Sequence, residues 1–257
     1  GALIAGSAAS KARHGMNESI ARLSTGMRSM YGGDAAGQSV ANTLQARSKS
    51  WAICARNAED GISAAQTAES ALLEIAALAQ RLRELGMQAD NAALLSTTND
   101  VAAMNSEASA IGTAITGIIT KTTFNGVALL NQTGANNKTH AIGVTDDGAT
   151  VTLTTGVTLG GVTTAAAAGA EGTADTTLTR VAISLGHIAA GISALKGRQA
   201  VAYAASANLA AAASRVEDTD FAAETANLTK NSVLNQSAMA MVAQANQAQS
   251  AILAVLQ

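Results

Sequence analysis

The stretch Val233–Gln257, VLNQSAMAMVAQANQAQSAILAVLQ, decides how the rest of the chain is interpreted. Small and medium apolar residues recur in it at alternating steps of four and three, the a/d seam of a heptad repeat: Leu234, Ala238, Met241, Ala245, Ala248, Ile252 and Val255. The other positions are mostly Gln, Asn, Ser and Ala, without a charged residue. Because most helical stability comes from packing, we predict a helix that depends on a partner.

The composition predicts long, uninterrupted helices. The 257 residues include no proline, where average usage of about 5% would give roughly a dozen. Proline removes a backbone hydrogen bond and clashes inside a helix, so long helices explain its absence. Hydrophobic residues make up 48% of the chain and aromatic residues only 2%, so large side chains that fill a globular core are scarce.

Charge and residue types argue against several classes of function. The net charge of −2 offers no basic face, so nucleic acid is not a predicted partner. The single cysteine, Cys54, allows no internal disulfide, and His14, His140 and His187 lack metal-ligand spacing. We therefore predict no metal, no cofactor and no catalytic residue. The sequence has no apolar run of 18 residues, and residues 1–10 do not resemble a Sec-type signal, so we predict no membrane insertion.

A second weak stripe, in residues 3–30, is the candidate partner of the last helix. Its apolar positions are Ala9, Ala12, Met16, Ile20, Leu23 and Met27. Gly32-Gly33 interrupts the pattern, and Asp34 is a suitable N-cap for the next helix. The two weak stripes lie at opposite ends of the chain, so we expect them to pack together.

Stronger stripes predict a helix from Asp34 to Ala89, another from Val101 to Ile118, and a third from about Thr176 to Val216. Between the last two the composition changes to Gly, Thr and Val. His140–Val144 and Val151–Leu153 alternate around Asp147-Gly148, which indicates a β-hairpin.

Two further expectations concern the middle of the chain. Val157 and Leu159 are candidates for an additional strand, and residues 163–177 for a surface loop. The fold class expected is mainly α, an elongated rod of long helices in coiled-coil and bundle packing, with a small β-hairpin region in the middle. A helix of about 40–50 residues would reach roughly 60–75 Å.

Several short motifs follow one another in a fixed order, and together they resemble bacterial flagellin over nearly the whole chain. The motifs are Arg22-Leu23-Ser24-Thr25-Gly26, Asp34-Ala35-Ala36-Gly37, Ala55-Arg56-Asn57-Ala58-Glu59-Asp60-Gly61-Ile62-Ser63, Gln66-Thr67-Ala68-Glu69, Phe124-Asn125-Gly126, Arg215-Val216-Glu217-Asp218-Thr219-Asp220-Phe221-Ala222 and Ala243-Gln244-Ala245-Asn246-Gln247. The family usually opens with an Ile-Asn-Thr-Asn-like stretch, whereas this chain starts later, at Gly1-Ala2-Leu3-Ile4.

The resemblance implies a short flagellin with little or no outer domain. Residues 1–33 and 217–257 would form the terminal coiled coil called D0, and residues 34–131 and 175–216 the helical bundle D1. Residues 132–174 would be a hairpin region belonging to D1. The implied product is a helical homopolymer, the flagellar filament used for swimming, outside the cell. Subunits would travel by the flagellar type III route, with an export chaperone, cap and hook-junction proteins as partners.

The resemblance also implies a surface recognised by an animal Toll-like receptor, which would lie between subunits in the filament. Its residues here would be Gln80, Arg81, Arg83, Glu84, Leu85 and Glu107, with Arg81 and Leu85 at the principal positions. Gly86-Met87 replaces the more usual Ala-Val. The alternative interpretation of this segment is a solvated helix face with local charge pairs.

Three other functions compete with a filament subunit. A hook–filament junction protein shares similar ends, but the compact spacing between Gln66–Glu69 and Phe124–Gly126 favours the main filament. A helical signalling hairpin, such as a chemoreceptor cytoplasmic module, would also be poor in proline but would carry methylatable Glu/Gln pairs. An enzyme in the middle region would need a motif such as His-Glu-x-x-His, a nucleophile elbow or a phosphate loop, and the sequence has none.

Overall fold

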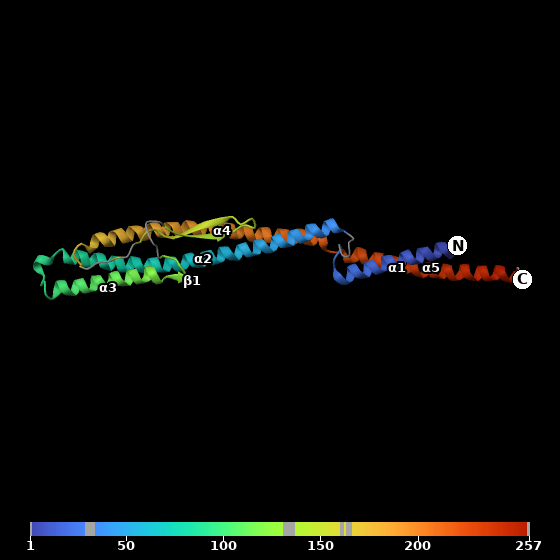
Figure 1. Ribbon diagram of the computed structural model, residues 1–257, viewed down its shortest axis with the longest axis horizontal. Coiled ribbons are helices and arrows are strands. Elements are labelled where there is room, and N and C mark those ends of the chain that lie inside the picture. The colour runs from blue at the N-terminus through green and yellow to red at the C-terminus, as the bar shows by residue number, and fades with distance from the viewer. Residues whose placement is uncertain (1, 29–33, 131–136, 160–161, 163–165, 256–257) are drawn as a thin grey trace. The chain divides into compact units, whose positions relative to one another are not determined.

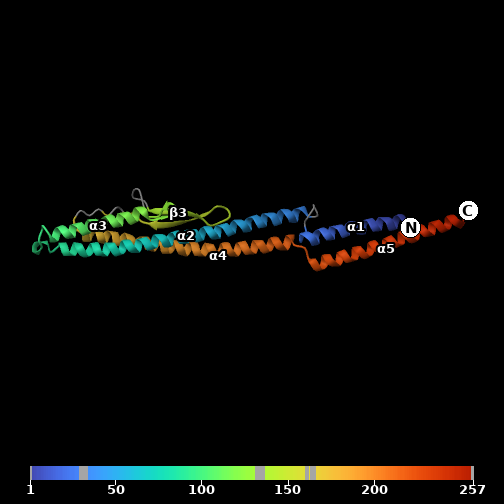
Figure 2. The same ribbon diagram turned by 90° about the horizontal axis from the view of Figure 1, so that it is seen from below.

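The computed structural model describes residues 2–28, 34–130, 137–159, 162 and 166–255 (Figures 1 and 2). The long helices of this part of the chain are α1 (Ala2–Thr25), α2 (Ala35–Ala89), α3 (Asp100–Lys121), α4 (Ala170–Glu217) and α5 (Phe221–Val255). A short 3-10 helix, η2 (Ala92–Leu94), lies between α2 and α3. About 78% of the described residues are helical, which confirms the mainly-α class.

The chain forms two compact units. One contains Gly1–Ser48 and Ala207–Gln257, and the other contains Lys49–Ser206. Both divisions fall inside continuous helices, α2 and α4. The domain limits expected at residues 33 and 217 lie beside helix ends instead, and they stay a prediction.

A large apolar core holds the unit Lys49–Ser206 together. Leu82 of α2, Ile115 of α3, and Ile188 and Leu195 of α4 are each at most 1% exposed and belong to one cluster. Figure 1 shows these three helices side by side. Burying one such side chain contributes about 1.5–3 kcal/mol, so the three-four stripes found in the sequence account for this bundle.

The predicted hairpin is present as β3 (Lys138–Gly143) and β4 (Thr150–Gly156), which pair antiparallel. His140 lies opposite Leu153 in the register. The turn uses Gly148 at φ +87°, a left-handed conformation that glycine adopts without strain. The Asp147 carboxylate accepts a hydrogen bond from the Thr145 hydroxyl, which lowers the pKa of Asp147. The Asp147-Gly148 turn signal is therefore confirmed.

A second, smaller hairpin precedes it, formed by β1 (Thr123–Phe124) and β2 (Val127–Ala128). Both residues between these strands, Asn125 at φ +48° and Gly126 at φ +78°, are left-handed, as a two-residue type I′ turn requires. The Asn-Gly turn signal is confirmed as well. Just beyond β2, the Leu129 carbonyl accepts a 2.6 Å hydrogen bond from the buried Thr155 hydroxyl of β4, which joins the two hairpins.

The additional strand expected at Val157 and Leu159 is absent from the described structure. The Val157 N–H donates to the Ser184 hydroxyl of α4 at 3.0 Å, so its hydrogen bond goes to a helix and not to a strand. Leu159 is 3% exposed and packs into the core. Leu159 therefore contributes a buried apolar side chain, whereas Val157 is half-buried.

The surface loop expected at 163–177 is wrong for its second half, because α4 already begins at Ala170. Ala167, Ala170 and Ala174 are at most 1% exposed, so this run of small residues packs closely onto the core. Gly169 at φ +77° makes the turn into the helix. Residues 163–165 lie outside the described residues.

The first helix also differs from its predicted span, since α1 ends at Thr25 and not near residue 30. Gly26 adopts φ +71°, and its N–H bonds to the Arg22 carbonyl at 2.8 Å, which is a glycine C-cap. Beyond it, Met27 forms an antiparallel bridge with Asp218. Residues 29 and 30 lie outside the described residues.

Candidate assembly surfaces

Helices α1 and α5 lie side by side in opposite directions (Figures 1 and 2). Nη1 of Arg22 lies 3.6 Å from Oε1 of Glu224, and Gly15 lies against the Asn231 amide. Arg22 and Gly15 are seven residues apart, and so are Glu224 and Asn231, so the two contacts are one heptad apart on each helix. The structure thus brings together the first and last helices of the chain.

On α1 the buried face follows the predicted stripe at first and then leaves it. Ala9 and Ala12 are 6% and 5% exposed, and Met16, Leu23 and Met27 are half-buried. At the next turn Ser19 is 2% exposed while Ile20 is 48% exposed, so the serine faces α5 and the isoleucine does not.

On α5 the predicted stripe is also only partly buried. Ala238 is 9% exposed and Ala245 is half-buried. Leu234 and Met241 are 48% and 61% exposed, and Ala248 is exposed, so this chain leaves them largely uncovered. The side chains of Ile252 and Val255 lie outside the described residues.

The face of α5 that α1 covers runs through polar residues that the search for apolar spacing missed. This face shares Ala238 and Ala245 with the predicted stripe, but Asn235 and Val242 replace Leu234 and Met241. Its positions still alternate in steps of four and three: Glu224, Leu228, Asn231, Asn235, Ala238, Val242 and Ala245. A Cβ atom at Gly15 would lie 2.7 Å from Nδ2 of Asn231, so a larger residue there would displace this amide. Counting back from Ala238 in steps of three and four reaches Asn235 and Asn231, so this spacing could have predicted the buried face.

The larger apolar side chains of the pair point away from the α1–α5 contact. Val233 and Met239 are 56% and 52% exposed, and on α1 Leu3 and Ile4 are 91% and 76% exposed. Together with Leu234 and Met241 they are apolar groups that other chains can cover. These exposed side chains are large apolar groups that the α1–α5 pair itself leaves uncovered.

A second candidate surface lies on the unit Lys49–Ser206, where Arg81 joins two helices. Its Nε donates to Glu107 of α3 at 2.8 Å, and its Nη1 donates to Glu84 at 2.9 Å. The hydrogen bonds to Glu107 and Glu84 raise the pKa of Arg81 above its ordinary value. Gln80 is exposed on the same turn of α2. Four of the predicted surface residues therefore lie together in solvent.

The other two predicted members lie elsewhere. Nε of Arg83 donates to Asp175 of α4 at 2.8 Å, so this arginine faces the opposite neighbour from Arg81. Leu85 is 1% exposed and belongs to the core cluster, so placing it on a surface was wrong. The neighbouring Gly86 lets the start of α4 come close, since a Cβ atom there would lie 2.5 Å from the Glu171 backbone nitrogen.

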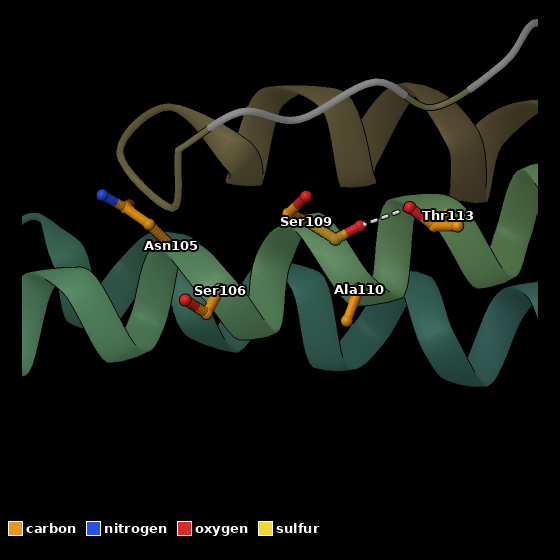
Figure 3. A pocket seen from close by; sticks show the side chains of 5 residues that line it. All are labelled: Asn105, Ser106, Ser109, Ala110 and Thr113. Atoms are coloured by element: carbon orange, nitrogen blue, oxygen red, sulfur yellow. Dashed lines mark hydrogen bonds between the residues drawn. The ribbon is translucent and has the colours of Figure 1, made fainter.

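A shallow depression of about 660 Å³ lies along α3 (Figure 3). It is lined by Asn105, Ser106, Ser109, Ala110 and Thr113. The Thr113 hydroxyl donates to the Ser109 carbonyl at 2.9 Å, and Asn105 Oδ1 accepts from the Ala167 N–H at 2.8 Å. These lining groups are small and uncharged, so the depression supplies neither an acid nor a base for a reaction.

A smaller cavity of about 240 Å³ lies where the two hairpins meet α2. Asp60, Phe124, His140, Ile142 and Leu153 are among its lining residues. Nε2 of His140 is buried and has no hydrogen-bond partner among the described groups. This is a packing cavity with one titratable ring.

We expect acidification to destabilise the region around this ring. Burial and, second, the charge of Lys138 lower the pKa of His140 from its ordinary value of 6.5. Between the lowered pKa of the folded state and 6.5, the unfolded chain binds more protons than the folded chain. The stability that the neutral His140 contributes is therefore fully present above pH 6.5 and is lost as the pH falls through the folded-state pKa. Thermal unfolding followed between about pH 7.5 and 5 measures this loss. In His140→Asn the loss of stability on acidification should be smaller than in the wild type. An equal loss in both proteins would assign it to other titratable groups.

The described residues hold no group of three His, Cys, Asp or Glu side chains placed to bind a metal ion. Cys54 is buried, and that burial is the main cause that raises the pKa of its thiol. A raised pKa disfavours the thiolate, so Cys54 is not an activated nucleophile. α4 is long and apolar enough to cross a membrane by length and composition, as the core helices of soluble proteins also are. Its residues Val181, Ile188 and Leu195 pack in the bundle core.

Both ends of the chain match models of known protein families. Residues 1–135 match the bacterial flagellin N-terminal helical region, and residues 170–256 match the bacterial flagellin C-terminal helical region. The two models leave only a short segment between them, with no large outer domain.

Full-length relatives agree with these matches. A flagellin of Halalkalibacterium halodurans is 35% identical over 93% of this chain and 91% of its own length. A flagellin of Bacillus subtilis is 30% identical over 93% and 92%, and Flagellin FlaB2 of Treponema pallidum is 31% identical over 94% and 92%. A crystal structure of Bacillus cereus flagellin matches 60% of this chain and 88% of its own at 23% identity, with a TM-score of 0.38 that does not bear on the fold.

Proposed function

Because this chain belongs to the bacterial flagellin family, it is a structural subunit of the extracellular flagellar filament, and we propose that its α1–α5 pair is the part that assembles with other copies. The observation that carries the function is the match of both chain ends to the two helical regions of the family. The filament is a self-polymer that serves motility.

The proposed domain limits lie close to the ends of helices. Residues 1–33 and 217–257 form the terminal coiled coil, residues 34–131 and 175–216 the bundle, and residues 132–174 a hairpin region of the bundle. Two features support these limits: Gly26 ends α1, and Asp220 caps α5 by accepting from the Ala222 N–H at 2.9 Å. The proposed assembly residues are the predicted stripes of α1 and α5, with Leu234 and Met241 turned toward neighbouring copies.

The surface formed by Gln80, Arg81, Glu84 and Glu107 is proposed as a contact between subunits and as a receptor surface on monomers. Its charges support a polar contact, because Arg81 already holds two carboxylates in a fixed fork. Arg81→Glu should weaken binding to the animal Toll-like receptor, measured as the affinity of the monomer for the immobilised receptor ectodomain. Arg83→Glu, on the other side of α2, is the matched control, and equal losses in both would contradict the assignment.

Export by the flagellar type III route, with a chaperone on the C-terminal segment and with cap and hook-junction proteins as later partners, completes the proposal. The large exposed fraction of α5 supports it, since a helix with one buried face is held weakly in a single chain. The proposed role is structural, without enzymatic activity or a cofactor.

Seeded assembly tests the function directly. The concentrated protein is mixed with filament fragments and examined by electron microscopy, and we expect filaments that lengthen from the seeds. Monomers that persist at every concentration and seeding condition, with the family's usual opening segment added at the N-terminus, would rule out the polymer function for this chain.

A further inference from the structure

In the unit of Gly1–Ser48 and Ala207–Gln257, the segment that follows α1 is joined to the segment between α4 and α5. Residues 26–28 follow α1, and residues 218–220 connect α4 to α5. Met27 and Asp218 form an antiparallel bridge. The Arg28 N–H donates to the Glu217 carbonyl at 2.7 Å, and the Thr219 N–H donates to the Gly26 carbonyl at 2.9 Å. A two-bond ladder thus links segments from opposite ends of the chain.

The side chain of Arg28 extends this link to two helix ends. Its Nη2 and Nε lie 3.1 and 3.4 Å from the Val216 carbonyl, in the last turn of α4. The same Nη2 donates to Oδ2 of Asp34 at 2.9 Å. An arginine at this position satisfies a helix carbonyl that has no donor within its own helix and complements the negative end of the helix dipole.

Asp34 is itself occupied at the start of α2. Its Oδ1 accepts from the Gly37 N–H at 2.8 Å, which caps the helix. A Cβ atom at position 37 would displace the Asp34 carboxylate from this position. Arg28 therefore connects the end of α4 with the cap of α2 through one planar group.

We propose that Arg28 is a latch: its guanidinium holds residues 26–28 and the start of α2 against the end of α4, and so positions α1 and α5 for assembly. Only its effect on assembly rests on the proposed function; the latch itself is a property of the single chain. An isolated exposed ion pair would contribute little. Here the same group also bonds the main chain beside a ladder and next to Glu217, which is 5% exposed and accepts from Gln45. Its fork geometry is specific to arginine.

Hydrogen exchange of the Arg28 and Thr219 amides in the monomer tests the latch. In Arg28→Met we expect both amides to exchange about tenfold faster, since hydrogen bonds to charged groups have effects of this size. Arg28→Lys keeps the charge but not the fork and should resemble Arg28→Met. Arg13→Met, on an exposed turn of α1 where the described residues show no hydrogen bond or ion pair, should change neither amide.

Asp34→Asn provides a second variant that keeps an acceptor for the helix cap but removes the charge. It should speed exchange less than Arg28→Met does, because the bonds from Arg28 to the Val216 carbonyl remain. Adding Asp34→Asn to Arg28→Met should change nothing further, because Arg28→Met already lacks the Arg28–Asp34 ion pair. Protection equal to wild type in Arg28→Met, or full protection in Arg28→Lys, would overturn the latch. Far-UV circular dichroism confirms that the helices persist in each variant.

Assembly provides the second readout. A loosened link must be ordered when the subunit joins a filament, so Arg28→Met should raise the critical concentration for seeded growth at least fivefold. A disulfide between Met27→Cys and Asp218→Cys, in a Cys54→Ala background, should restore the wild-type value, because facing residues of a bridge are close enough to be cross-linked. An unchanged critical concentration, or no rescue, would overturn the positioning role. If the wild-type chain itself does not grow, the proposed function fails while the exchange result still decides the latch.

Discussion

We expect no filament growth from a chain that combines Leu234→Asp and Met241→Asp. Both side chains are about half or more exposed in the single chain, so the substitutions leave the α1–α5 seam intact. In a filament they would place two carboxylates in a contact between copies, and a buried unpaired charge costs several kcal/mol. Seeded growth followed by electron microscopy and sedimentation should fall about a hundredfold or more.

The matched control carries the same two charges on the opposite side of the same helix. Gln236→Asp and Ala243→Asp are also seven residues apart, and both positions are exposed. We expect this variant to assemble within a few-fold of wild type. If it fails as completely as the first variant, no single face of α5 mediates assembly; if both assemble, α5 does not assemble through this face.

The second large effect concerns Gly86 of α2, which packs against the start of α4. Gly86→Ala should lower the free energy of unfolding by about 1–3 kcal/mol, because overpacking forces backbone shifts. A Cβ atom there would lie 2.5 Å from the Glu171 backbone nitrogen and 3.1 Å from its Cβ atom. Urea unfolding followed by circular dichroism measures the change.

Gly117→Ala is the control for this prediction. Gly117 also lies within a helix, α3, but an added Cβ atom there meets no atom within 4 Å. Replacing a helical glycine by alanine without a clash should stabilise the protein by roughly 0.5–1 kcal/mol. Equal effects of the two substitutions would show that helix propensity and not packing governs Gly86.

Helix positions could be predicted from the sequence because large aliphatic residues mark a buried stripe clearly. Ile115 and Leu195 are examples, since each lies on a three-four stripe and each is fully buried. Turns could be predicted for a different reason: Asn125, Gly126 and Gly148 take left-handed backbone conformations that few residues adopt.

Alanine-rich segments were harder to interpret, since alanine occurs on buried and exposed faces alike. The start of α4 was therefore missed, although Ala170 and Ala174 are almost fully buried. The seam predicted for α1 and α5 differs from the observed one for the same reason. Its specific contacts are polar, such as Ser19 and Asn231 opposite Gly15, and a search for apolar spacing passes over them. Leu85 was misplaced because motif resemblance carries no information on burial.

The pairing of α1 with α5 has a consequence for the order in which the chain folds. The two helices stand at the beginning and end of the sequence, so α1 has no partner until the last segment has been synthesised. Closing a loop of some 200 residues costs about 5 kcal/mol of chain entropy, with the (3/2)RT ln n dependence. Prior folding of the unit Lys49–Ser206 and formation of the Met27–Asp218 bridge would shorten that loop to a few residues. We therefore expect refolding in which helical signal from α1 and α5 appears last, in a phase that slows when the bridge is weakened.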